Sequence, residues 1–243
     1  MRETLILVPG LLCDATVWEH QVAALSPDYD IQIADLTSQI SISDMAAYIL
    51  NNAPMKFSIA GHSMGARVAL SVVDQAPDRV ERIALLDTGV HPATDYEPAK
   101  RQIMVDLSAR SGMQALADQW LPPMVKEGAL DSNPTLRQQL CDMVGRMSPE
   151  IHKRQITALL NRPDARAQLS HISCPVLIGV GEFDRWSPPE QHEEIAAGIL
   201  HAEYIVFPDS GHMAPMEAPE AVSDALKQWM RGSRTVRQSA IGV

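Results

Sequence analysis

Ser63 lies at the centre of Gly61–Gly65 (GHSMG), a segment with the pattern GxSxG. The apolar run Phe57–Ala60 precedes this segment, and the helical pattern of Met64–Gln75 follows it. In a sharp turn between a strand and a helix, glycines permit the close packing and the serine hydroxyl is presented at a helix N-terminus, where negative charge is favoured. The alternative is a glycine-rich turn with an incidental serine. The full context favours Ser63 as a nucleophile.

A serine hydroxyl is a weak nucleophile and needs a neighbouring base. His212, in the loop after the last apolar run, is the candidate base. Asp184, in the loop after an earlier run (GEFDRWSPP), is the candidate carboxylate that would fix the histidine tautomer. Glu182 in the same loop is the alternative acid. The chain order of serine, acid and histidine matches that of nucleophiles placed on such a turn.

Acyl transfer also requires hydrogen-bond donors for the oxyanion that forms on the substrate. The expected donors are the backbone N–H groups of Met64, directly after the nucleophile, and of Leu11, after the first apolar run. Leu12, Trp186 and Met213 flank these residues in the sequence, so they are candidates for the substrate pocket. We expect this pocket to be apolar.

Apolar runs alternate with amphipathic stretches along most of the chain. Six runs are predicted strands: 5–8, 29–34, 57–60, 80–86, 176–180 and 204–207. Five stretches are predicted helices: 17–25, 43–50, 64–75, 188–197 and 218–230. Continuously apolar strands separated by helices predict an α/β fold, with a parallel sheet of about six strands covered on both faces. Ligands of such sheets bind at the carboxyl ends of the strands.

Residues 91–172 differ in character, because they contain no clear strand and five of the twelve methionines. We interpret them as an inserted cap of three to five helices, in which each methionine packs in the core or lines a pocket. Residues 1–90 and 173–231 then form the α/β core. The tail, 232–243, is expected to be disordered. The run His192–Glu194 is expected to be an exposed helix face.

Composition excludes several classes of protein. The chain has 30 acidic and 20 basic residues and no long basic stripe, so neither nucleic acid nor an anionic membrane is an expected partner. No segment has the pattern of a signal peptide or of a membrane span. Three scattered cysteines are typical of a reducing cytoplasm. No metal or nucleotide motif is present, so we expect no cofactor and a small-molecule substrate, without a prediction of oligomeric state.

The segments GHSMG, GEFDRWSPPE and DSGHMAPMEAPE together resemble the signature segments of the α/β-hydrolase superfamily, in its branch of serine esterases and C–C hydrolases. The resemblance covers the chain except for the tail and is weakest in the cap. It implies Ser63 as nucleophile, Asp184 as acid and His212 as base. Two features depart from the pattern: Pro9-Gly10 replaces the usual His-Gly before the oxyanion donor, and the usual first hairpin is missing.

These observations favour a carboxylesterase-like serine hydrolase that cleaves a small, largely apolar ester or related carbonyl compound through an acyl-enzyme on Ser63. Two alternatives stay open. The same machinery could serve a C–C bond hydrolase or lyase. It could also belong to a ligand-sensing protein with little turnover, because the resemblance includes hormone receptors and stress regulators.

Overall fold

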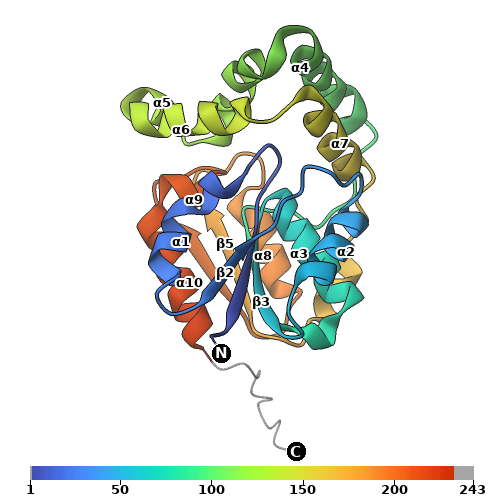
Figure 1. Ribbon diagram of the computed structural model, residues 1–243, viewed down its shortest axis with the longest axis vertical. Coiled ribbons are helices and arrows are strands. Elements are labelled where there is room, and N and C mark those ends of the chain that lie inside the picture. The colour runs from blue at the N-terminus through green and yellow to red at the C-terminus, as the bar shows by residue number, and fades with distance from the viewer. Residues whose placement is uncertain (1, 233–243) are drawn as a thin grey trace, which may run out of the picture.

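The computed structural model describes residues 2–232, and its centre is a sheet of six parallel strands (Figure 1). The strand order is β2-β1-β3-β4-β5-β6. The strands are β1 (Thr4–Val8), β2 (Asp30–Ile33), β3 (Phe57–His62), β4 (Val80–Leu86), β5 (Val176–Gly181) and β6 (Ala202–Phe207). The predicted six-stranded parallel sheet is thus confirmed. The prediction for the tail lies outside the described residues, apart from Gly232.

The direction of the chain through the sheet reverses beside β1. The chain passes from β1 to the edge strand β2 and then returns across β1 to β3. Such a reversal leaves a crevice at the carboxyl ends of the two strands, because their following connections run in opposite directions. The segments after β1 and β3 contain Leu11 and Ser63, so the topology brings these two residues to one crevice.

Burial explains why the apolar runs form central strands. Every residue of β1, β3 and β5 is buried, as expected for strands that are covered by helices on both faces. The edge strand β6 is different, because Phe207 is its only buried residue. The central strands therefore form a rigid base under the crevice, with their carboxyl ends pointing toward it.

Helices cover both faces of the sheet (Figure 1). On one face, α1 (Glu19–Leu25) packs against α10 (Pro219–Arg231). On the other face, α2 (Ile42–Asn52) packs against α3 (Met64–Gln75), and α8 (Pro189–Ala197) contacts β5 and β6. Right-handed crossovers require this division, because the chain moves one way from β1 to β2 and the other way in every later crossover.

A helical segment between β4 and β5 lies over the carboxyl ends of the strands (Figure 1). It contains α4 (Glu97–Trp120), α5 (Ala129–Ser132), α6 (Pro134–Gly145) and α7 (Pro149–Leu160). Asn133 and Ser148 cap α6 and α7 with their side chains, and α4 is interrupted at Gly112, where φ is 81°. The segment therefore covers the crevice from above.

Among the described residues, no helix is both long enough and apolar enough to cross a lipid bilayer.

Candidate active site

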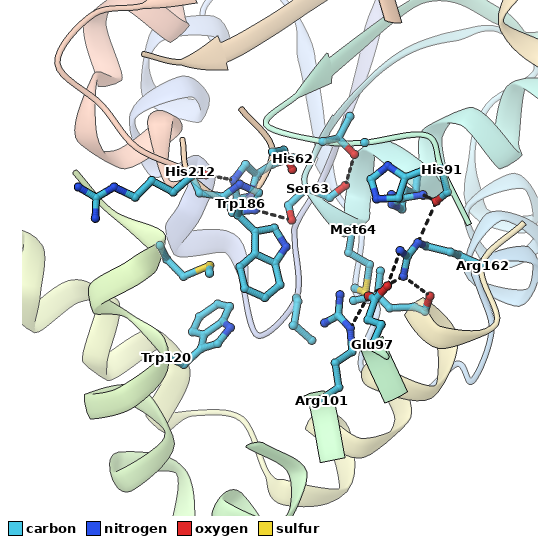
Figure 2. Close-up of a pocket in the computed structure, with 18 of the residues that line it drawn as sticks. His62, Ser63, Met64, His91, Glu97, Arg101, Trp120, Arg162, Trp186 and His212 are labelled. Carbon is cyan, nitrogen blue, oxygen red and sulfur yellow. Dashed lines mark hydrogen bonds and ion pairs between the residues drawn. The ribbon is translucent and has the colours of Figure 1, made fainter. Parts of the chain in front are cut away.

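Ser63, His212 and Asp184 form a continuous chain of hydrogen bonds at the carboxyl ends of the strands. Figure 2 shows Ser63 and His212, with the bond between them dashed. The Oγ atom of Ser63 lies 2.8 Å from Nε2 of His212, and Nδ1 of His212 lies 2.7 Å from Oδ2 of Asp184. These residues follow β3, β6 and β5 respectively. The fold brings together three side chains that are far apart in the sequence, because parallel strands end at the same edge of the sheet.

The backbone of Ser63 adopts the strained conformation of a sharp strand-to-helix turn, with φ 55° and ψ −116°. Its N–H donates to the backbone oxygen of Leu86 at 2.8 Å, which anchors the turn to β4. A Cβ atom at Gly61 would lie 2.3 Å from the backbone oxygen of Gly65. Only glycine fits this crossing, which explains the GxSxG spacing.

Asp184 is held by backbone donors as well as by the histidine. Its Oδ1 accepts the N–H groups of Trp186 at 2.8 Å and Ser187 at 2.9 Å, while Oδ2 faces His212. Burial by itself would raise the pKa of Asp184, but His212 and the two N–H groups outweigh it and hold this pKa below its ordinary value. Glu182, the alternative acid, is exposed and accepts the N–H of Asp209. The structure therefore places Asp184, and not Glu182, against His212.

Two further histidines are linked by hydrogen bonds to the backbone of His212 and Ser63. His62 lies within hydrogen-bond distance of the backbone oxygen of His212, with Nε2 at 2.7 Å. Burial, followed by the neighbouring His212, lowers the pKa of His62 to about 3, so that the ring is neutral and donates this bond. His192 accepts the N–H of Thr88 at 2.8 Å, and the Thr88 hydroxyl donates to the backbone oxygen of Ser63 at 2.9 Å.

The position of His192 corrects the sequence analysis, which expected it on an exposed helix face. Its side chain is fully buried. Burial lowers its pKa to about 4, which keeps the ring neutral and able to accept a hydrogen bond. The error arose because α8 has a short apolar face, and His192 occupies that face beside Ile195.

The two expected oxyanion donors lie beside Ser63. Met64 is the first residue of α3, where N–H groups have no acceptor within the helix. Leu11 follows Gly10, which is so close to Ser63 that a Cβ on this glycine would lie 3.2 Å from the serine Cβ. Both Leu11 and Met64 line the cavity described below. These positions allow both N–H groups to face a substrate oxygen.

Leu12 lies outside the cavity, unlike the other predicted pocket residues. Its side chain is fully buried in the core. Its N–H donates to Oε1 of Gln155 at 2.9 Å, and Nε2 of Gln155 donates to the backbone oxygen of Leu36 at 3.2 Å. Gln155 belongs to α7, so the helical segment above the sheet holds the loop that carries Leu11.

A cavity of about 260 Å³ opens at Ser63 and His212. Trp186 and Met213 line it, as the sequence analysis expected, and so do further apolar residues of the core and the helical segment: Leu11, Met64, Trp120, Met124 and Leu159. Figure 2 shows Trp120 and Trp186 toward the side of His212. Of the five methionines of residues 91–172, Met124 reaches this cavity.

The cavity is more polar than the apolar pocket that the sequence analysis expected. Five basic residues also line it: Arg67, Lys100, Arg101, Arg162 and Arg185. Glu97 lies among them and binds Arg162 and Arg101 (Figure 2). Sequence reasoning missed this cluster. Arg67 could have been found, because it lies in the first turn of the helix that begins directly after Ser63, whereas Glu97 and Arg162 meet only in the folded chain.

The described residues do not gather three or more histidine, cysteine, aspartate or glutamate side chains in a metal-binding arrangement.

Comparison with known proteins gives a consistent result. Residues 5–225 match the model of the alpha/beta hydrolase family. Among curated proteins, the chain is 23% identical to a pimeloyl-[acyl-carrier protein] methyl ester esterase of Nitrosomonas europaea, over 89% of this chain and 91% of that protein. It is 25% identical to the (E)-2-((N-methylformamido)methylene)succinate hydrolase of Acinetobacter baylyi, over 94% of this chain and 90% of that protein.

Solved structures show the same likeness. A thermophilic esterase from Thermogutta terrifontis, solved with malate bound, superposes with a TM-score of 0.85 at 28% identity, over 94% of this chain and 89% of that one. The enol-lactonase of Burkholderia xenovorans LB400 superposes with a TM-score of 0.88 at 22% identity, over 96% and 92% of the two chains. The sheet, the strand-to-helix turn at Ser63 and the family match over most of the chain lead to one conclusion: this protein is a member of the α/β-hydrolase family.

Proposed function

We propose that this protein is a serine hydrolase that cleaves a small ester or related carbonyl compound through an acyl-enzyme on Ser63. The observation that carries the proposal is the unbroken hydrogen-bond chain from Ser63 through His212 to Asp184, at the wall of a cavity. A hydroxyl in this arrangement has the base that it needs for nucleophilic attack. The relatives named as esterases and hydrolases support the same class of reaction.

In the proposed reaction each group has a distinct role. Ser63 Oγ attacks the carbonyl carbon while its proton moves to Nε2 of His212. Asp184, whose pKa is low, stays ionised, holds the other histidine proton on Nδ1 and stabilises the imidazolium. The N–H groups of Leu11 and Met64 stabilise the negative charge on the tetrahedral oxygen.

The intermediate then collapses, and His212 gives its proton to the oxygen of the leaving alcohol. The acyl group stays bonded to Ser63. A water molecule, deprotonated by His212, attacks this acyl-enzyme, and the acid leaves as the serine regains its proton. We propose that the apolar part of the substrate contacts the apolar lining of the cavity, including Trp186 and Met213. Cleavage of a carbon–carbon bond and ligand sensing with little turnover would use the same residues, and they are the alternatives to ester hydrolysis.

The test uses a fluorophosphonate probe, which labels activated serines, together with p-nitrophenyl esters of increasing chain length. The wild type and an exposed-serine control, Ser26→Ala, should be labelled and active. Ser63→Ala should lose the label and several powers of ten in turnover, because the three residues act as a unit. Retained labelling in Ser63→Ala would refute the proposal. Labelling of the wild type without turnover of any ester would favour the alternatives.

A further inference from the structure

The cavity beside Ser63 has an excess of positive charge, although the whole chain has a net charge of −10. Among the described residues that line it, Glu97 is the one acidic residue, against five basic residues. Clefts that concentrate one sign of charge raise the local concentration of ligands of the opposite sign. The excess therefore indicates an anionic ligand, provided that some of the basic groups are free to bind it.

Arg162 is not free, because all its donors are used. Its Nε donates to the backbone oxygen of His91, and its Nη atoms donate to both carboxylate oxygens of Glu97, each at 2.8 Å. The Nη atoms also donate to the backbone oxygens of Leu159 and Pro92. These five bonds fill the donor capacity of a guanidinium group. Arg162 thus fixes Glu97 in place.

Arg101 has donors to spare. Its Nε donates to Oε1 of Glu97 at 2.7 Å, and within residues 2–232 its Nη atoms make no hydrogen bond. The side chain is only 10% exposed, and its guanidinium lies 5.7 Å from the centre of the Trp186 ring (Figure 2). Glu97 therefore orients Arg101, which lines the cavity, while leaving its Nη donors without an acceptor in the described part of the chain.

Arg67 has no carboxylate partner in the described part of the chain. Its Nη1 donates to the backbone oxygen of His91 at 3.0 Å. Burial, and then the charge of Arg162, lower the pKa of Arg67 to about 9, so the group stays protonated at pH 7. A largely buried cation without a counter-ion is unfavourable, and an anionic ligand would remove this cost.

Arg67 is also well placed relative to the nucleophile. It lies in the first turn of α3, four residues beyond Ser63, and both residues line the same cavity. A carboxylate bound by Arg67 and a carbonyl carbon at Ser63 would therefore occupy the same cavity. Both groups can belong to one small molecule that fits a cavity of about 260 Å³.

We propose that the unused N–H donors of Arg67 and Arg101 bind a carboxylate on the acyl part of the substrate, which makes the preferred substrate a short monoester of a dicarboxylic acid. This inference rests on the proposed serine hydrolase function. It assigns Arg67 and Arg101 to specificity and Glu97 and Arg162 to the positioning of Arg101.

The first experiment compares esters that differ in charge but not in acyl length. Monomethyl glutarate carries a carboxylate where methyl pentanoate carries a methyl group. We expect kcat/KM to be at least about tenfold higher for the charged ester, because hydrogen bonds to charged groups are stronger than neutral ones. Equal values would overturn the proposal. In 3-acetoxypropanoate the carboxylate lies on the alcohol part of the ester, and propyl acetate is its neutral counterpart. A preference for 3-acetoxypropanoate over propyl acetate, without a preference for monomethyl glutarate, would overturn the proposal that the carboxylate lies on the acyl part.

The second experiment measures the same charged-to-neutral ratio of kcat/KM in three variants. Arg67→Met should lower the ratio by about 10- to 100-fold, and Arg67→Lys should restore part of it. Arg110→Met is the matched control, since it removes an exposed cation of α4 that does not line the cavity. An unchanged ratio in a folded Arg67→Met variant would overturn the proposal.

The third experiment separates the subsite from the hydrolase function. Binding of monomethyl glutarate to Ser63→Ala and to Ser63→Ala with Arg67→Met is measured by calorimetry, which needs no turnover. Weaker binding by about 10-fold or more in the double variant supports the subsite even if the fluorophosphonate test fails. Equal binding refutes the subsite, even if the same protein with Ser63 intact is labelled and hydrolyses neutral esters.

Discussion

Gly65 packs so tightly against the end of β1 that its replacement by alanine should disrupt the proposed active site. A Cβ atom at this position would lie 2.1 Å from the backbone oxygen of Val8 and 2.6 Å from that of Pro9. Ordinary contacts of a Cβ begin at 3.4 Å, so the first contact is short by 3.4 − 2.1 = 1.3 Å. Both obstacles are backbone atoms, and no side-chain rotation can relieve them.

The start of α3 or the loop after β1 must therefore shift by about 1 Å, a displacement that can lower the rate about 100-fold when it affects reacting groups. The loop carries Leu11, and Ser63 and Met64 lie at the start of the helix, so the proposed nucleophile and the proposed oxyanion donors would lose their alignment. Overpacking of this kind also destabilises a fold, typically by about 1–3 kcal/mol. We expect Gly65→Ala to lower both kcat/KM and the free energy of unfolding.

Gly145→Ala provides the matched control. Gly145 is the last residue of α6, and a Cβ there would meet no atom within 4 Å. Alanine in a helix is more favourable than glycine by about 0.5–1 kcal/mol, so this variant should be as stable as the wild type or slightly more stable. Urea unfolding and ester kinetics measure the two effects. Wild-type stability and kcat/KM in Gly65→Ala would refute the packing argument.

Three other predictions follow from the hydrogen bonds around the site. Asp184→Asn should leave the fold intact but lower kcat by about 10³- to 10⁴-fold, because an amide can favour the wrong tautomer of His212; near-normal kcat would contradict the assigned role. Burial raises the pKa of Glu217 to about 6, although three backbone N–H groups that donate to its carboxylate act in the opposite direction. The contribution of this group to the free energy of unfolding is therefore present below pH 4.5 and is lost as the pH rises through 6. Urea unfolding should show the stability of the wild type relative to Glu217→Gln falling by about 2 kcal/mol between pH 4 and pH 7, whereas a constant difference would argue against the raised pKa. Gln155→Leu should lower stability by about 1–3 kcal/mol in thermal unfolding, because it leaves the buried N–H of Leu12 without an acceptor; an unchanged melting temperature would count against this bond.

The sequence alone predicted the sheet and the three residues of the hydrogen-bond chain for a clear reason. Each of these residues lies in the segment that follows a strand, and the carboxyl ends of parallel strands meet at one edge. The glycines at 61 and 65 identified the turn, because the constraint that they satisfy is local. Only the path of the loop after β5 shows that Asp184, and not Glu182, faces His212.

Tertiary structure decided the features that depend on which side of a segment faces the site. Leu11 and Leu12 are adjacent in sequence, yet one lines the cavity and the other is buried in the core. His192 was misplaced because the short apolar face of its helix was not recognised.

By itself, the sequence determined the fold, the turn at Ser63 and the order of Ser63, Asp184 and His212, since periodicity and local glycine constraints specify them. Only the tertiary structure showed that the cavity is cationic. Glu97 and Arg162 are 65 residues apart in the chain, and their pairing determines how Arg101 is oriented. The donors left open in Arg67 and Arg101 are a property of this packing, because a guanidinium is free or saturated only according to the acceptors that the fold places around it.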